Sequence, residues 1–334
     1  MRRVVVFLSV SAILAVSITL ASFIYGAAAE GPRVIRFGTA VNEQDSFQHA
    51  AELFAQLVYE RTDGAYMIDI FPNAALGDER TMLEGMQMGT LDMAIITGGS
   101  FVNFVQEMGV LDMPFLFDSG EQAYYILDGE VGRELLDLLG DVRLKGLAFA
   151  ERGFRNLTNS VVPVYSAEDL PGLQIRVMEN EIYIAAFEAL GANAVPMAWT
   201  EALTALGQGT IDGQENPINV IYSFRLWETQ RYITMTRHAY ASAIITMSLG
   251  LFDSLPQDVR QIFLDSALDA AIFTREWNAG NEAAQMDALR ENGMEIIEYP
   301  DIESFRDAVQ GVYEGYEDVF GYHISKINRA LGRD

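Results

Sequence analysis

Residues 173–214 read LQIRVMENEIYIAAFEALGANAVPMAWTEALTALGQGTIDGQ, and their pattern decides the fold class. LQIRV, NAVPM and TIDGQ have the length of strands, and the two segments between them have the length and composition of helices. Gly191 ends the first predicted helix, because glycine readily adopts the left-handed conformation found after a helix. Thr200 begins the second as its N-cap. The stretch therefore predicts the order strand-helix-strand-helix-strand.

The first third of the chain repeats this order. Apolar residues recur every three or four positions from Phe47 to Val58, which marks one face of a helix. The fragments MGTLDMAI (88–95) and QGTIDGQE (208–215) occupy the same place in the two halves and share Gly-Thr-Leu/Ile-Asp. These features predict an α/β protein of two similar lobes, each a sheet flanked by helices. The predicted elements are strand 34–39, a helix from 47, strand 66–71, helix 77–89 and strand 91–96.

The rest of the chain is predicted to connect the lobes. Residues 219–233 have helical composition, 240–252 form an apolar strand-like run, and 256–292 form a long helical region without internal proline. A helix of that length can span both lobes. The expected division is a signal peptide at 1–29, lobe I at 30–152 plus about 242–281, and lobe II at 153–241 plus about 282–334.

The composition is that of a folded, acidic protein without cysteine. The 334 residues include 47 Asp and Glu against 22 Lys and Arg, which gives a formal net charge of −25. This charge disfavours binding to nucleic acid or to an anionic membrane surface. The absence of cysteine excludes disulfides, thiolate metal ligands, a cysteine nucleophile and a lipid anchor on cysteine.

The N-terminus has the layout of an export signal. MRR is a basic start, VVVFLSVSAILAVSITLASFIYG is an apolar run, and AAAE offers a small-residue cleavage site at Ala27 and Ala29. Cleavage after Ala29 predicts a soluble periplasmic protein. An uncleaved membrane anchor is the alternative, because the apolar run is long.

A ligand site is expected beyond the carboxyl ends of the strands, where open α/β sheets bind ligands. Arg176 lies near the end of LQIRV, and by alternation its side chain faces away from Ile175 and Val177. Arg155 follows the extended run LKGLAFA, and Asn216 follows TIDGQ. Each has an ordinary alternative: a solvated strand arginine, a loop ion pair and a turn former before proline. Together they favour a ligand site shared by the matching strand ends of the two lobes.

Signals for an enzyme or a metal site are few. His49, His238 and His323 have no metal-binding spacing, and neither G-x-S-x-G nor H-E-x-x-H occurs. Gly207-x-Gly209 closes a predicted helix and precedes a strand, which is the reverse of the order in a dinucleotide-binding loop. The sequence therefore predicts no catalytic residue, no metal and no cofactor.

Four segments together resemble the solute-binding subunits of TRAP (tripartite ATP-independent periplasmic) transporters of the dicarboxylate-binding-protein (DctP) type. They are FPNAALGDERTMLEGMQMGTLDMAI (71–95), GFRNLTNS (153–160), the run from DLPGLQIRVMEN through GQENP to His238, and SLPQDVR (254–260). The resemblance covers nearly the whole mature chain. It implies two α/β lobes around a cleft, hinged by crossing strands and a long helix.

The resemblance also implies an organic-acid ligand and residues that hold it. An arginine at the position of Arg176 binds the solute carboxylate, a second arginine falls at Arg155, and an asparagine falls at Asn216. Glu79, next to Arg80, corresponds to a position that often helps to bind the rest of the solute.

The solute is expected to be a sugar acid. The loop at 97–100 reads TGGS and lacks the glutamate and arginine of the sialic-acid branch, which argues against sialic acid. A sugar acid is favoured because the predicted site loops carry many polar side chains, whereas C4-dicarboxylates and other carboxylic acids remain alternatives. These side chains are Asn42, Gln44, His49, Glu79, Asn180, Gln214, Asn216 and His238.

The expected partners follow from the same resemblance. The protein is expected to deliver its solute to the small and large membrane subunits of a TRAP permease and to reach the inner membrane only through them. Closure of the cleft is expected, because a ligand that bridges both lobes binds the closed state better. A periplasmic sensor and a periplasmic enzyme acting on an acid are the rival function classes.

Overall fold

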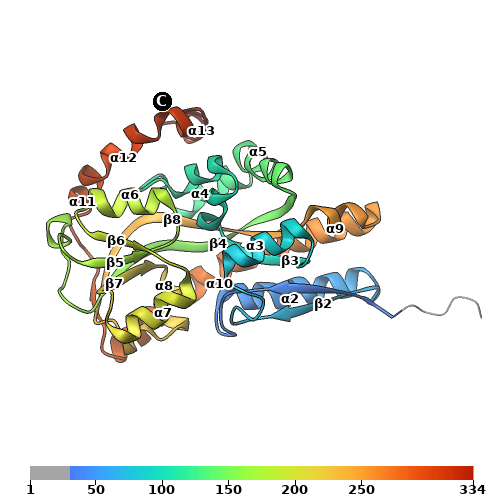
Figure 1. The fold of residues 1–334 in the computed structure, drawn as a ribbon, viewed down its shortest axis with the longest axis horizontal. Helices are drawn as coiled ribbons and strands as arrows, with labels where there is room; N and C mark the ends of the chain where they lie inside the picture. Colours follow the sequence, from blue (N-terminus) through green and yellow to red (C-terminus); the bar gives the residue numbers. More distant parts are fainter. Residues whose placement is uncertain (1–30, 334) are drawn as a thin grey trace, which may run out of the picture.

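The computed structural model describes residues 31–333, which form a nine-stranded mixed sheet with helices on both faces (Figure 1). The strands lie in the order β2-β1-β3-β8-β4-β7-β5-β6, and β9 pairs with β8. The predicted signal peptide, residues 1–29, falls outside the described residues. Within residues 31–333, no helix combines the length and the apolar composition of a membrane span.

The elements have the following bounds. The strands are β1 (Arg33–Gly38), β2 (Tyr66–Phe71), β3 (Met93–Thr97), β4 (Leu144–Asn159), β5 (Gln174–Val177), β6 (Asn193–Pro196), β7 (Gly213–Asn216), β8 (Tyr232–Ser248) and β9 (Glu295–Ile297). The helices are α2 (Ser46–Arg61), α3 (Glu79–Met88), α4 (Gly120–Leu127), α5 (Glu130–Leu138), α6 (Glu181–Ala189), α7 (Trp199–Gln208), α8 (Ile218–Ser223), α9 (Leu249–Ser254), α10 (Gln257–Glu291), α11 (Ile302–Ala308), α12 (Gln310–Gly315) and α13 (Glu317–Ala330).

The two ends of the sheet correspond to the two predicted lobes. In lobe I, β1 pairs in parallel with β2 and β3, and in lobe II, β5 pairs in parallel with β6 and β7. The order strand-helix-strand-helix-strand is therefore confirmed in both halves. Asp45, Asp78 and Asn180 begin α2, α3 and α6, because each side chain accepts a hydrogen bond from a backbone N–H of the first turn.

The start of α7 differs from the prediction. Thr200 is not its N-cap: the helix begins at Trp199, after Ala198, without a side-chain cap. The earlier start places the Trp199 ring edge-to-face with Phe224 at 5.1 Å and against the guanidinium of Arg176 at 5.4 Å. These packing contacts outweigh the modest stabilisation that a threonine cap provides.

The segment 219–233 is also less helical than predicted. Only α8 and one short turn form there, because Arg225 adopts a left-handed backbone conformation with φ of 53°. The chain then enters β8 at Tyr232, several residues before the predicted strand start. Antiparallel pairing with β4 therefore overrides the local helical composition.

Strands β4 and β8 run from one lobe to the other and join the two halves of the sheet. LKGLAFA and the following ERGFRNLTN form one strand, so Arg155 lies in a strand and not in a loop. The pairing register shifts between Glu151 and Gly153 and again between Arg155 and Leu157. Such irregularities bend a strand and redirect its side chains, and here they occur at the crossing between lobes.

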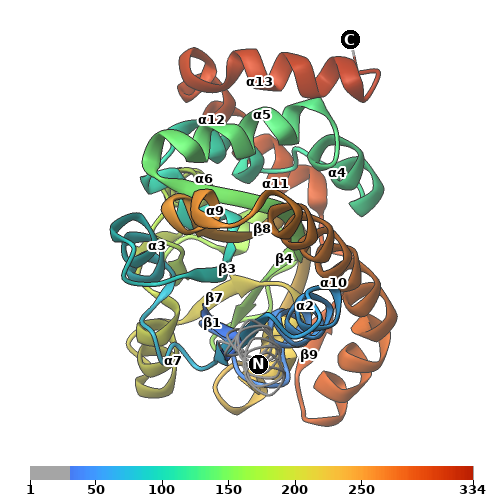
Figure 2. The same cartoon turned by 90° about the vertical axis from the view of Figure 1, so that its right-hand side faces the viewer.

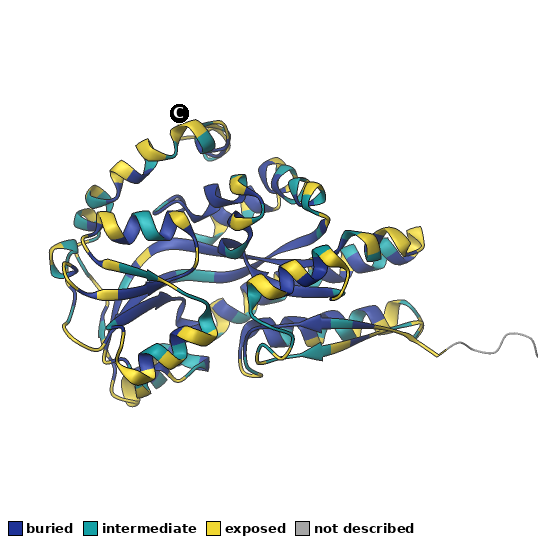
Figure 3. Ribbon diagram, viewed as in Figure 1, coloured by how far each residue is buried: buried dark blue, intermediate teal, exposed yellow. Residues whose placement is uncertain are grey.

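The long helix α10 packs along both lobes, as predicted for 256–292 (Figure 2). Its inner face joins the lobe I core, where the rings of Phe37 and Phe263 each lie edge-to-face with Phe54 at 5.7 Å. Figure 3 shows buried strands at the centre and exposed outer helix faces. The expected lobe boundaries fall inside β4, β8 and α10 and remain a prediction.

We expect the junction of β4 and β7 to tolerate no side chain at Gly213. A Cβ there lies 2.1 Å from the carbonyl oxygen of Thr158, whereas a Cβ at Gly207 in α7 meets nothing within 4 Å. Gly213→Ala should therefore lower the free energy of unfolding by about 1–3 kcal/mol. Gly207→Ala should leave it unchanged or raise it by up to about 1 kcal/mol. Urea unfolding of both variants measures this difference, and equal stabilities would contradict the tight β4–β7 contact.

Candidate functional site

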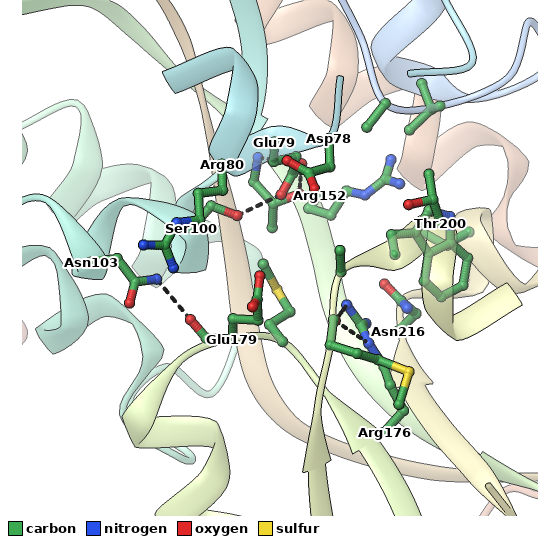
Figure 4. Close-up of a pocket in the computed structure, with 18 of the residues that line it drawn as sticks. Asp78, Glu79, Arg80, Ser100, Asn103, Arg152, Arg176, Glu179, Thr200 and Asn216 are labelled. Atoms are coloured by element: carbon green, nitrogen blue, oxygen red, sulfur yellow. Dashed lines mark hydrogen bonds between the residues drawn. The ribbon is translucent and has the colours of Figure 1, made fainter. Parts of the chain in front are cut away.

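A cleft of about 710 Å³, partly open to solvent, lies between the lobes (Figure 4). Residues of lobe I, of the crossing strand β4 and of lobe II all contribute to its walls. They are Ala40, Val41, Asp78, Glu79, Arg80, Thr97, Ser100, Asn103, Arg152, Arg155, Arg176, Met178, Glu179, Met197, Ala198, Trp199, Thr200, Asn216 and Val220.

Arg176 is a buried cation in this cleft without a carboxylate partner. Its Nε and one terminal nitrogen donate to the carbonyl oxygen of Met197 at 3.0 and 2.7 Å, and its guanidinium lies against Trp199. Among residues 31–333 no acidic side chain forms an ion pair with it. Burial lowers the pKa of Arg176 to about 10, so the group stays protonated at neutral pH. An anion in the cleft can supply the missing counter-charge.

Arg155 also lines the cleft, but its charge is already matched inside the protein. It forms a two-pronged ion pair with the buried carboxylate of Glu215 and donates to the Glu215 backbone carbonyl at 2.7 Å. Nε2 of His238 lies 3.2 Å from the same carboxylate. Burial alone raises the pKa of Glu215, but the charge of Arg155 and the hydrogen bonds lower it to about 2. Arg155 therefore contributes shape and donors to the cleft more than net positive charge.

Asn216 lies in the cleft wall at the end of β7, supported from behind. Its side-chain nitrogen donates to Oε1 of Gln214 at 2.6 Å, and Gln214 donates to Oγ1 of Thr158 at 2.9 Å. Gln214 and His238 are both buried outside the cleft. The structure thus places these two predicted ligand residues behind Asn216 and Glu215, where they orient other side chains.

Glu79 and Arg80 enter the cleft from the first turn of α3. The Glu79 carboxylate accepts hydrogen bonds from the backbone N–H and hydroxyl of Thr97 at 2.9 and 2.7 Å and from the Ser100 hydroxyl at 2.6 Å. Arg80 is half-exposed and pairs with Glu84 at 3.2 Å. The cleft therefore holds a fixed carboxylate that forms no ion pair with a described residue.

Four further polar residues of the predicted loops have their contacts outside the cleft. His49 lies on α2 outside the cleft, near Glu52 at 3.5 Å and against the ring of Trp277 at 5.4 Å. Asn42 donates to the carbonyl of Ser223 at 2.9 Å, and Asn180 donates to Asp112 at 2.8 Å. Gln44 is exposed, and its backbone N–H donates to the Asn42 side chain. None of the four lines the cleft.

Sequence reasoning missed Arg152 and Trp199. In a regular strand Arg152 and Arg155 would face opposite sides, because they are three residues apart. The register shift between Glu151 and Gly153 brings both to the cleft. The early start of α7 does the same for Trp199. Neither irregularity leaves a mark in the sequence pattern. Within residues 31–333 no group of His, Cys, Asp and Glu is arranged to hold a metal ion.

The fold and cleft define a two-lobed solute-binding protein. The chain belongs to the DctP family, bacterial extracellular solute-binding protein family 7, whose model matches residues 37–318. The resemblance to TRAP solute-binding proteins is therefore confirmed. One relative is the 2,3-diketo-L-gulonate-binding periplasmic protein YiaO of Escherichia coli, which is 37% identical over 298 residues. The match covers 88% of this chain and 91% of the relative.

Solved structures of TRAP solute-binding proteins confirm the two-lobed fold. The chain is 36% identical to a periplasmic protein of Polaromonas bound to D-erythronate, with a TM-score of 0.87 over 88% of this chain and 98% of the other. It is 32% identical to the sugar acid binding protein of Advenella mimigardefordensis in complex with galactonate, with a TM-score of 0.88 over 91% and 99% of the two chains.

We expect Arg155→Met to unfold more easily because it leaves the Glu215 carboxylate buried and without its cation. Losing one partner of a buried pair costs about 3–5 kcal/mol. Adding Glu215→Gln should recover part of this loss, because the second charge is then removed as well. Urea unfolding of the single and double variants measures both effects. A double variant no more stable than Arg155→Met would contradict a structural role of the pair.

The same pair predicts a pH dependence. In the native protein the Glu215 pKa is about 2, below its usual value of 4.5, so the pair stabilises the fold at neutral pH and is lost as pH falls towards 2. In Arg155→Met burial is no longer opposed by the arginine and raises that pKa. The stability gap between native protein and variant should therefore narrow as pH falls from 7 to 4. Unfolding curves at several pH values check this; a constant gap would contradict it.

Proposed function

We propose that the protein captures a sugar acid, a monocarboxylate with several hydroxyl groups, and delivers it to a TRAP membrane permease. The observation that carries this proposal is Arg176, a buried guanidinium at a strand end with no carboxylate partner among the described residues. An arginine fork binds a carboxylate through two parallel hydrogen bonds and stabilises it strongly in a site shielded from water.

The charge balance of the cleft favours one carboxylate on the solute over two. Arg155 is matched by Glu215, Arg152 by Asp45 at 2.5 Å, and Arg80 by Glu84. Arg176 is left to attract an anion, while Glu79, together with Asp78 and Glu179 in the same wall, repels a second one. The Glu79 carboxylate is instead a good acceptor for solute hydroxyl groups, because the hydroxyls of Thr97 and Ser100 donate to it and fix its orientation.

The ligands of similar proteins support the same class. The relatives named above carry D-erythronate and galactonate in their structures, and the E. coli relative is described as binding 2,3-diketo-L-gulonate. All three ligands are hydroxylated acids with one carboxylate. The C4-dicarboxylate alternative has a counterpart in the 27% identical dicarboxylate-binding protein of Bacillus subtilis, but it conflicts with the position of Glu79.

Closure of the cleft is the proposed link between binding and delivery. Asn42 and Ser46 of lobe I bond Ser223 and Asn219 of α8 at 2.9 and 3.1 Å across the mouth of the lobes. A solute that touches Arg176 on one side and Glu79 on the other adds contacts only when the lobes are together, so it shifts the population towards the closed form. Export by residues 1–29 would place this cycle in the periplasm.

Removing Arg176 should abolish capture without unfolding the protein. Arg176→Ala is expected to weaken binding of galactonate and erythronate by more than about 100-fold, since the solute carboxylate loses its buried partner. Arg36→Ala is the matched control, because Arg36 is a half-exposed arginine of β1 that pairs with Asp92 at 3.2 Å. Calorimetry measures both variants. Unchanged affinity in Arg176→Ala would contradict the proposed site.

The preference of the protein for solutes with one carboxylate over solutes with two tests the argument from the charges in the cleft. Galactonate should raise the melting temperature of the native protein more than galactarate, the dicarboxylate with the same carbon chain, because Glu79 repels the second carboxylate. Ligand binding raises the melting temperature by mass action. A thermal-shift series that includes succinate measures this order. A larger shift with galactarate or succinate would favour the dicarboxylate alternative.

A further inference from the structure

We propose that Arg152 is a specificity-determining residue that contacts the end of the solute remote from its carboxylate. This inference rests on the proposed function of the cleft. Arg152 lies in β4 at the register shift beside Glu151 and is only 4% exposed. Its side chain lines the solute cleft and also a second cavity on the other side, which Phe154 and Arg237 help to form. Arg152 is thus part of the wall between the two cavities.

The orientation of Arg152 is fixed by lobe I. One terminal nitrogen donates to Oδ1 of Asp45 at 2.5 Å, and the guanidinium lies over the Phe47 ring at 4.2 Å. Asp45 is itself held, because it accepts from the Phe47 backbone N–H at 3.0 Å and from the Ser223 hydroxyl at 3.3 Å. A side chain fixed in this way presents its donors without a large loss of conformational entropy on binding.

The guanidinium of Arg152 makes only part of the hydrogen bonds that it could donate. Asp45 engages one terminal nitrogen, and within residues 31–333 the Nε and the other terminal nitrogen have no hydrogen-bond partner. Arg155 differs, because both its Nε and a terminal nitrogen bond Glu215. Arg152 therefore has two guanidinium nitrogens whose N–H groups bond no described residue, whereas Arg155 has one.

The position of Arg152 defines which part of the solute it can reach. Figure 4 shows Arg152 on the side of Asp78 and Glu79, while Arg176 lies with Asn216 on the opposite side. A solute whose carboxylate binds Arg176 therefore directs its chain towards Arg152. Because Asp45 already balances the charge of Arg152, its free donors suit hydroxyl oxygens better than a second carboxylate. The Arg152 contact should therefore strengthen the binding of acids whose carbon chain is long enough to cross the cleft.

Chain length provides the test. Dissociation constants of galactonate, with six carbons, and erythronate, with four, are measured by competition in the native protein and in Arg152→Ala. The loss of the Arg152 contact should weaken galactonate at least 10-fold and erythronate less than threefold, so that the preference between them shrinks. Arg237→Ala, which lines the second cavity but not the solute cleft, should leave the preference unchanged. Arg152→Lys keeps the charge at Asp45 but loses the fork, and it should shrink the preference as well.

The outcomes separate the two proposals. If native protein binds neither acid, the proposed function fails and this inference fails with it. If native protein binds but Arg152→Ala weakens both acids equally, Arg152 has a structural role only and the inference is overturned. Unchanged affinities in Arg152→Ala overturn it too. If Arg152→Ala does not fold, the ratio of the galactonate and erythronate dissociation constants in Arg152→Lys decides between the two roles of Arg152.

Discussion

The cleft depends on a constraint on buried charge: a guanidinium taken out of water needs a partner. Three arginines are buried around it, and each meets the constraint differently. Arg152 has Asp45 and Arg155 has Glu215. Arg176 has only the carbonyl of Met197 and the face of Trp199. A carbonyl and a ring stabilise a cation less than a carboxylate does, so the requirement remains partly unmet until an anion binds.

The sheet topology explains why these three side chains meet. Strands β4 and β8 are shared by both lobes, so residues of β4 lie at the base of the cleft whichever lobe moves. Two register shifts in β4 turn Arg152 and Arg155 towards the same space. Parallel pairing of β5 with β7 brings Arg176 beside Gln214 and so close to the end of β7, where Asn216 lies. The crossing strands thus serve as both connection and binding surface.

The sequence predicts the repeated part of this arrangement well and the irregular part poorly. The order of elements in each lobe, the long helix and the position of Arg176 follow from hydrophobic period, caps and strand ends, which are local signals. Arg152 depends on a register shift, and the partner of Arg155 depends on a pairing of β4 with β7 across 60 residues. Polar composition selected His49 and His238 for the site, whereas their tertiary contacts leave them outside the lining of the cleft. Polarity alone does not reveal which side of a strand or helix a residue occupies.

An acidic protein can capture an anion because the attraction is local. A formal charge of −25 repels an anionic solute at a distance, but salt screens exposed charges beyond about 8–10 Å. Inside the cleft the low polarity of the surroundings strengthens the field of Arg176 instead. The same burial lowers the pKa of Arg176, since it disfavours the charged form of the guanidinium. A bound carboxylate offsets this cost, and the offset adds to the affinity for the solute.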